Sequence, residues 1–406
     1  MLRGCKNMKR LGLGCIIGIV LILSSTISVT GSLKQKGIIA DVLIYTDVGT
    51  WDEGVTAFEK FLEFKDLTWY ECDDSYIENN NLIGLYNAIH FPGGSSAQYN
   101  AQINEDGLSH IRDFVAAGGG YLGICAGSSF ACDRVIWQGE TYDYPLDLFA
   151  GVGYGPIEEI APWPTYTITS IAMNASNPIN QYEPSSEDIM YYGGDSFYAD
   201  EGQEMQVIGT YDLYNNDPAV INFQYGEGRV VLFGPHPEIE EDSTRDEVSF
   251  ADHLEDLGTD WDLLWTTMDW ILGHVISEPP ETLPPDIPSI NGPVLGIKQI
   301  DYNYSIITSD PELEEIYYKI DWDDGDIEEW IGPYDSNEEI TVTHQWAEKG
   351  SYLIKVKAKD CNDVESDWAT LEVVMPVNQQ LSHPLFHWFL ERFSNAFPIL
   401  RQLLGL

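Results

Sequence analysis

The stretch from Gly120 to Ser128 constrains the fold of this chain more than any other. The run from Tyr121 to Ile124 is short and apolar, which predicts a buried strand. It leads directly into Cys125, and the small residues Ala126 and Gly127 follow. A nucleophile at the end of a strand needs such neighbours, because the turn that exposes its side chain leaves little room. The pattern therefore predicts a strand, a sharp turn at Cys125 and then a helix.

Backbone amides near this turn are candidates for binding an oxyanion. A helix that begins after Cys125 has unpaired amides and a positive dipole end, and both favour the thiolate over the thiol. The amide of Ala126 is the first candidate donor. A second donor is expected from Gly93 or Gly94, in the Pro-Gly-Gly loop after the apolar run 86–91. Glycine lets a backbone amide approach a ligand closely.

A histidine and a carboxylate stand two residues apart much later in the chain, at His236 and Glu238. They follow residues 228–233, whose β-branched and apolar side chains predict a strand. Pro237 favours extended backbone at His236, and side chains two residues apart in an extended chain point the same way. His236 is therefore the candidate base for Cys125, and Glu238 is the candidate that orients the imidazole.

The surrounding pattern alternates between strands and helices, which is typical of an α/β domain with a parallel sheet. Apolar strands are expected at 40–45, 67–70, 86–91 and 121–124, and an amphipathic helix at 261–272 closes the domain. Sites in open α/β sheets collect past the carboxyl ends of strands, where Cys125 and His236 are both expected. The stretch 135–227 is less regular. Within it, residues 191–195 form either a pocket-lining loop or a simple turn.

These three motifs, in this order, resemble the class I glutamine amidotransferase superfamily. Residues 119–127 and 234–238 are most similar to the biotin-protein ligase N-terminal domain family, and the resemblance covers roughly 38–276. It implies a flavodoxin-like domain with a triad of Cys125, His236 and Glu238, but it implies no substrate. A cysteine after a strand can also be a small buried hydrophobic residue, so a structural role for Cys125 stays open.

The charge of the chain excludes some partners. With 66 acidic and 20 basic residues the formal net charge is −46, which argues against nucleic acid or an anionic membrane surface as an electrostatic partner. A solvated acidic surface is the simplest interpretation.

The N-terminal residues 1–31 have the order of a secretory signal. Basic residues come first, an apolar run follows at 11–23, and small residues continue through Gly31. Cleavage near 29–31 would release the chain, whereas retention would leave a membrane anchor. We therefore expect an extracellular or cell-surface protein, with membrane association through this segment as the alternative to release.

The pattern changes after a proline-rich linker at 277–287. Residues 288–376 show short alternating strands, which predict an all-β sandwich. The turn 322–326 and the segments 344–346 and 350–352 resemble a PKD domain. In that family such a turn is mainly structural, so its acids are interpreted as turn residues, with calcium binding there as the lesser alternative. The tail 377–406 is rich in aromatic residues and leucine, and either docks at a membrane interface or packs on protein.

The sequence therefore predicts an exported cysteine hydrolase that acts on an amide or peptide bond, with a small-molecule or peptide substrate and with no cofactor or metal. The competing hypothesis is a surface protein without catalysis, in which the same fold binds a ligand and the sandwich mediates adhesion. Glutamine-dependent ammonia transfer is less expected, because the sequence pattern offers no synthase domain to consume the ammonia.

Overall fold

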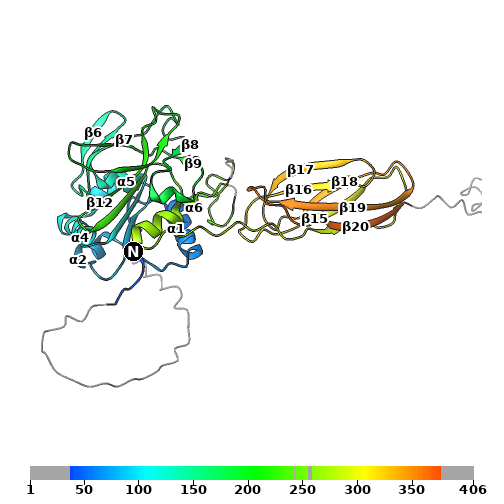
Figure 1. Ribbon diagram of the computed structural model, residues 1–406, viewed down its shortest axis with the longest axis horizontal. Helices are drawn as coiled ribbons and strands as arrows, with labels where there is room; N and C mark the ends of the chain where they lie inside the picture. The colour runs from blue at the N-terminus through cyan, green and yellow to red at the C-terminus, as the bar shows by residue number, and fades with distance from the viewer. Residues whose placement is uncertain (1–36, 242, 255–257, 376–406) are drawn as a thin grey trace, which may run out of the picture. The chain divides into compact units, whose positions relative to one another are not determined.

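The computed structural model describes residues 37–241, 243–254 and 258–375. The chain divides into two units between Glu281 and Thr282, and each unit is described by itself (Figure 1). The predicted signal or anchor segment, 1–31, and the predicted tail, 377–406, lie outside the described residues. Among the described helices, none has the length and apolar character needed to cross a membrane.

The first unit is built on a nine-stranded mixed sheet. Five parallel strands form one part of it, in the order β2-β1-β3-β4-β13. Their bounds are Val42–Tyr45 (β1), Trp69–Cys72 (β2), Ala88–Phe91 (β3), Gly120–Ile124 (β4) and Gly228–Phe233 (β13). The strands expected from apolar runs before Cys125 therefore lie side by side, and β13 lies directly beside β4.

Four antiparallel strands extend this sheet beyond β13, so the sheet is mixed and the expectation of a parallel sheet holds for only part of it. They are β12 (Pro218–Tyr225), β11 (Gln206–Tyr211), β8 (Thr167–Met173) and β9 (Ser186–Tyr191). The reason is visible in the connection from β12 to β13, which is only Gly226 and Glu227. Parallel neighbours need a crossover of a dozen or more residues, so this turn permits only an antiparallel pair.

Both faces of the sheet are buried. Along β1, Leu43 and Tyr45 belong to one core cluster, whereas Val42 and Ile44 belong to another. Helix α4 (Glu105–Ala116) contributes to the first cluster, and helices α1 (Asp52–Phe64) and α6 (Trp261–Leu272) contribute to the second. Covering a sheet on both faces explains why its strands read as continuous apolar runs. Short helices are found at Asp74–Asn79 (α2), Ser96–Gln102 (α3), Ala126–Ala131 (α5) and Pro178–Gln181 (η1).

A second sheet of four strands begins directly after α5, in the order β10-β7-β5-β6. Its bounds are Cys132–Trp137 (β5), Glu140–Asp143 (β6), Phe149–Gly155 (β7) and Ser196–Ala199 (β10). The less regular stretch of the sequence, 135–227, therefore supplies strands to both sheets: β6, β7 and β10 to this one, and β8, β9, β11 and β12 to the large one.

The second unit consists of two antiparallel sheets around one core. One sheet holds β14 (Ser289–Asn291), β15 (Tyr302–Ile307) and β18 (Ile340–His344). The other holds β17 (Ile327–Tyr334), β16 (Ile316–Asp321), β19 (Gly350–Lys359) and β20 (Ala369–Met375). Tyr304 from the first sheet and Tyr318 from the second lie in the same core cluster with Trp322 and Trp346. This arrangement fits the predicted β-sandwich.

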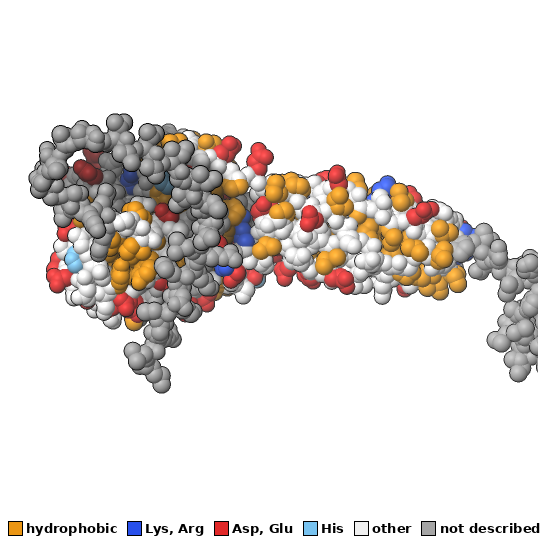
Figure 2. Space-filling model, turned by 90° about the horizontal axis from the view of Figure 1, so that it is seen from below, with side chains coloured by type: hydrophobic (Ala, Val, Ile, Leu, Met, Phe, Trp, Pro, Cys, Tyr) orange, Lys and Arg blue, Asp and Glu red, His pale blue; other side chains and the backbone are white. Residues whose placement is uncertain are grey.

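Acidic side chains are scattered over the surface of both units, with few basic ones between them, on the face shown in Figure 2. Among the described residues visible on that face, they do not gather in one patch. This distribution fits the interpretation of the net charge as a solvated acidic surface.

Candidate active site

Cys125 lies at the turn between β4 and α5, where the sequence predicted it. Its backbone has φ 49° and ψ −108°, in the region that residues with a Cβ rarely adopt. The amide of Cys125 donates to the carbonyl of Phe233 at 2.8 Å, and its own carbonyl accepts from Ser128 and Ser129, each at 3.0 Å. Such a conformation costs on the order of 1–3 kcal/mol and persists only where neighbouring contacts hold it.

Contacts around the turn explain why its neighbours are small. A Cβ on Gly127 would lie 1.8 Å from the carbonyl oxygen of Phe91, at the end of β3. A Cβ on Gly123 would lie 2.6 Å from the carbonyl oxygen of Gly127. The backbone can therefore fold this tightly only with glycine at both positions.

His236 and Glu238 lie just past the end of β13, beside the end of β4. The amide of His236 donates to the carbonyl of Met190 at 2.8 Å, which fixes the backbone after the Gly234-Pro235 turn. Nδ1 of His236 and Oε1 of Glu238 are 2.8 Å apart, and each side chain is only 1% exposed. Because a carboxylate accepts, Nδ1 carries the hydrogen, which leaves Nε2 as the other functional atom of the ring.

The pKa of His236 responds to both of its neighbours. Burial by itself lowers it, but the charges on Glu238 and Cys125, together with the hydrogen bond to Glu238, raise the pKa of His236 to about 10. The imidazole is therefore protonated at neutral pH. An imidazolium beside a cysteine stabilises the thiolate.

The Sγ atom of Cys125 lies between these residues and the loop after β9. It is positioned to donate to the carbonyl of Tyr192 at 3.6 Å, and Cys125 is only partly buried. The structure thus brings Cys125, His236 and Glu238 to one place, and Cys125 is the least buried of the three. Their catalytic roles stay a prediction.

The Pro-Gly-Gly loop packs against the imidazole. A Cβ on Gly93 would lie 2.7 Å from Cε1 of His236. Gly94 has φ 136°, and a Cβ there would lie 2.0 Å from the carbonyl oxygen of Gly49. In the part of the chain that the structure describes, no backbone carbonyl accepts a hydrogen bond from the amides of Gly93, Gly94 or Ala126. All three amides are therefore available for the predicted role as oxyanion donors.

An aromatic wall, formed by Trp51, Tyr192 and Phe250, lies against His236 and was not predicted as a unit. The ring centroids of Trp51 and His236 are 5.1 Å apart, and those of Trp51 and Phe250 are 4.9 Å apart. Tyr192 lies 6.4 Å from His236 and 5.5 Å from Phe250. Tyr192 belongs to the loop at 191–195, so the pocket-lining alternative for that loop fits its position.

A buried carboxylate, Asp195, supports the helix after Cys125. It accepts a hydrogen bond from the hydroxyl of Ser129 in α5. Burial raises the pKa of Asp195 to about 7, and the bond from Ser129 opposes the shift. Sequence alone could not find this contact, because the residues are 66 positions apart and only the fold brings them together.

Comparison with known proteins gives matches for both units. Residues 40–262 match the family model described as biotin-protein ligase, N terminal. A biotin-protein ligase of Schizosaccharomyces pombe is 34% identical over 158 residues, which are 36% of this chain and 25% of that protein. An uncharacterized protein of Chlamydia muridarum is 33% identical over 154 residues, 36% of this chain and 58% of that one. The chain thus spans a quarter and somewhat over half of these two relatives.

Among solved structures, the PKD domain of an M14-like peptidase from Thermoplasmatales archaeon SCGC AB-540-F20 is similar to part of this chain. It is 48% identical, covers 24% of this chain and 100% of that domain, and has a TM-score of 0.24. The PKD domain of the human VPS10 domain-containing receptor SorCS2 is 15% identical, with a TM-score of 0.19. The 48% identity over the whole of the first of these domains matches the predicted resemblance to PKD domains.

Proposed function

This chain belongs to the biotin-protein ligase N-terminal family, and from that membership and the surroundings of Cys125 we propose that its first unit is a cysteine hydrolase acting on an amide or peptide bond. One observation carries the proposal. A cysteine held at positive φ between a strand and a helix lies beside a buried imidazole whose other nitrogen is 2.8 Å from a carboxylate.

Each of these residues has its own role in the proposed reaction. Sγ of Cys125 attacks the carbonyl carbon, and amides of Ala126 and of Gly93 or Gly94 donate to the oxygen that becomes negative. His236 then gives a proton to the leaving nitrogen as the C–N bond breaks. Water cleaves the resulting thioester, with His236 taking the proton and Glu238 holding the imidazole throughout.

The fold fits this proposal. The order β2-β1-β3-β4-β13 is the order of a flavodoxin-like sheet, in which sites lie past the carboxyl ends of the strands. We propose that the first unit is a flavodoxin-like domain whose antiparallel strands are an extension. The name of the relative from Schizosaccharomyces pombe describes ligation of biotin to protein, but the match covers a quarter of that ligase, and we do not carry its activity over.

Export and cell-surface location belong to the same proposal and rest on the N-terminal pattern of the sequence alone. The substrate class, a small molecule or a peptide, rests on the exposure of Cys125 and on the aromatic wall beside it.

The second candidate is ligand binding without catalysis, and the aromatic wall favours it. Trp51, Tyr192 and Phe250 offer flat apolar surfaces to a ligand next to His236. In that case Cys125 would be a structural residue of the turn, and its thiol would show no enhanced reactivity.

Alkylation of the full chain with iodoacetamide separates the two candidates. We expect Cys125 to react at about pH 6.5 at least about tenfold faster than an unperturbed cysteine, because an imidazolium stabilises its thiolate. Peptide mass spectrometry reads each cysteine separately. Cys72 and Cys132 are internal controls, since burial raises the pKa of both thiols well above its ordinary value.

The variants His236→Ala and Cys125→Ala complete the test. The first should slow alkylation of Cys125 about tenfold or more, and the second should remove that signal while leaving the other cysteines unchanged. Cleavage of a panel of fluorogenic amides and peptides by the native chain, but not by Cys125→Ala, would support hydrolysis. Alkylation of Cys125 at an ordinary rate, unaffected by His236→Ala, would instead favour ligand binding.

A further inference from the structure

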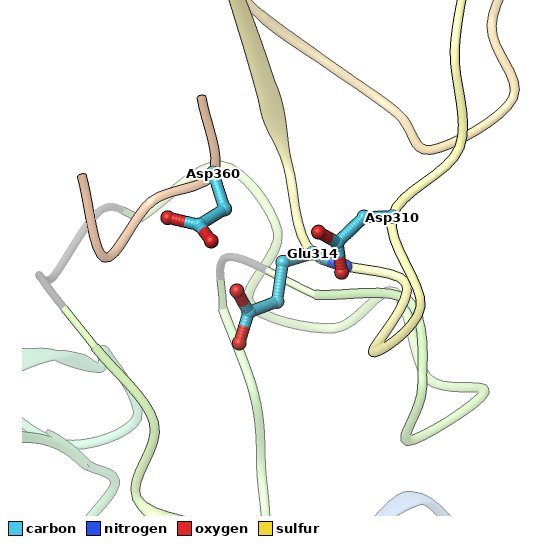
Figure 3. Close-up of side chains that lie close together, drawn as sticks. All are labelled: Asp310, Glu314 and Asp360. Carbon is cyan, nitrogen blue, oxygen red and sulfur yellow. The ribbon is translucent and has the colours of Figure 1, made fainter. Parts of the chain in front are cut away.

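Three buried carboxylates meet at one end of the second unit. Asp310 lies in the loop after β15, Glu314 lies in the same loop before β16, and Asp360 follows β19 directly. Figure 3 shows their side chains facing the space between the two loops. Oxygen atoms from all three lie within 4.8 Å of one another. Exposure is 2% for Asp310, 1% for Glu314 and 0% for Asp360.

The two aspartates each use one oxygen to hold their loop. Oδ1 of Asp310 accepts from the amides of Glu312 and Glu314, at 2.9 and 3.1 Å. Oδ1 of Asp360 accepts from the amide of Val364 at 2.8 Å. These bonds orient both carboxylates, so that the second oxygen of each is fixed in position.

The second oxygens are the ones that indicate a ligand. Oδ2 of Asp310 and Oδ2 of Asp360 are buried, and neither has a hydrogen-bond partner among the described residues. In that part of the chain neither aspartate pairs with a lysine, arginine or histidine. Buried carboxylates are costly unless they are paired, hydrogen-bonded or bound to a metal. Burial accordingly raises the pKa of Asp310 to about 6 and also raises the pKa of Asp360.

We propose that Asp310, Glu314 and Asp360 bind a divalent cation, and that the cation is Ca²⁺. The site is separate from the proposed hydrolase and does not depend on it. Its donors are all carboxylate oxygens, which select hard cations rather than zinc. Ca²⁺ accepts flexible sets of protein oxygens, whereas Mg²⁺ usually keeps several waters and binds only one or two carboxylates, so a group of three carboxylates favours Ca²⁺.

The aspartates of the turn 322–326, where calcium binding was the lesser alternative, are used differently. In the turn after β16, Asp323 accepts from the amide of Leu353 at 2.9 Å, and Asp324 lies 3.0 Å from Nε2 of His344. These carboxylates have protein partners, which fits their interpretation as turn residues. The inferred site joins residues about 50 positions apart, so local spacing in the sequence could not reveal it.

The loop that carries Asp310 also holds the start of the second unit. The amide of Asp286 donates to the carbonyl of Ser309 at 2.8 Å, and the amide of Leu283 donates to Glu312 at 3.2 Å. A cation that fixes Asp310 is therefore expected to order residues 283–286 as well, because the cation and this segment both bind the loop between β15 and β16.

Calorimetric titration of the full chain with CaCl₂, after removal of metal with EDTA, tests the proposal. About 0.5 M NaCl should be present, because screening suppresses diffuse binding of cations to an acidic surface. We expect one saturable site per chain and slower hydrogen exchange of the Leu283 and Asp286 amides when it is filled. The Asp310→Asn/Asp360→Asn double variant should bind at least about tenfold more weakly.

Two further variants keep the result interpretable. Glu314→Gln removes one ligand without touching the bonds to Oδ1 of Asp310 and of Asp360. Nδ2 of Asn362 donates to both oxygens of Glu314, and the Gln oxygen keeps an acceptor for it. This variant too should weaken binding. Asp326→Asn makes the same chemical change on the aspartate-rich turn and should bind Ca²⁺ as the native chain does. The proposal is wrong if the native chain shows no saturable binding at millimolar Ca²⁺, if Mg²⁺ binds more tightly, or if the Asp310→Asn/Asp360→Asn and Glu314→Gln variants both bind normally.

Discussion

Glu238 in the first unit and Asp310 in the second are both almost completely buried, but their surroundings have opposite charge. Glu238 lies 2.8 Å from an imidazole whose pKa it raises, so its charge has a partner within the protein. Asp310 faces two other carboxylates, and its own pKa is raised by burial. The same cost of burying a negative charge is offset internally at one site, whereas at the other it favours binding of an external cation.

The two sites also differ in how their backbones are held. The first depends on glycines that approach other backbone atoms closely, at Gly94, Gly123 and Gly127. The second depends on carboxylates that accept bonds from loop amides. A site held by backbone contact is fixed in the absence of a ligand, whereas a site held by charged side chains depends on what neutralises them.

Replacing Glu238 by Gln gives the largest expected effect, because it removes the internal partner but keeps the shape of the side chain. The pKa of His236 should then fall, since burial lowers it and one of the charges that opposes burial is gone. We expect turnover by the proposed hydrolase to fall about 10³- to 10⁴-fold, as expected when the acidic member of a triad loses its charge.

Two measurements check this expectation. In Glu238→Gln, alkylation of Cys125 should slow more at about pH 6.5 than at about pH 8.5. At the higher pH the solvent can deprotonate the thiol without help from the imidazolium. Glu201→Gln, on an exposed side chain, is the matched control and should behave as the native chain does. Equal rates of Cys125 alkylation in the Glu238→Gln and native chains at both pH values would show that the Glu238 charge does not control the reactivity of the thiol.

The sequence predicted the parts of the first site that local pattern determines. Cys125, His236 and Glu238 each follow an apolar strand, and parallel strands that end at the same sheet edge bring such residues together. The aromatic wall and Asp195 were harder to predict, because their contacts depend on how the irregular stretch folds back. For the same reason the antiparallel half of the large sheet was missed. In the second unit, the strand pattern predicted the sandwich but not which acids would be buried together.

Gly94→Ala is expected to have the next largest effect, on stability. The new Cβ would lie 2.0 Å from the carbonyl oxygen of Gly49, and the alanine backbone would also have to adopt a φ of 136°. Gly118→Ala is the matched control, because Gly118 has φ 108° but no atom lies within 4 Å of its Cβ position. Backbone strain alone costs about 1–2 kcal/mol, so the control should lose about that much and Gly94→Ala clearly more.

The free energy of unfolding in urea measures the difference between these two variants. A loss for Gly94→Ala no greater than for Gly118→Ala would mean that the loop can move away from Gly49. The loop would then not be the rigid support for His236 that the contact with Gly93 indicates.

The smallest expected effect is a difference in how pH changes the stability of the two units. Both pKa values are raised by folding, so stability should fall as pH rises in each unit, but in different windows. For His236 the stabilising contribution is complete below its unfolded pKa of 6.5 and is lost as pH rises through about 10. For Asp310 the destabilisation is fully present above about pH 6, where the folded carboxyl is charged. It lessens as pH falls towards the unfolded pKa of 3.8.

Amide hydrogen exchange can measure the second window in the full chain, in peptides from β15 and β19. Without Ca²⁺, these strands should be more stable at about pH 4.5 than at about pH 7, by on the order of 2 kcal/mol. Saturating Ca²⁺ should remove or reverse the difference, because the cation binds the charged carboxylates and competes with protons. Asp310→Asn/Asp360→Asn should flatten the pH dependence without added metal. If the native dependence persists in that variant, it arises elsewhere in the second unit, and the contrast between an internally paired carboxylate and an unpaired one would not explain it.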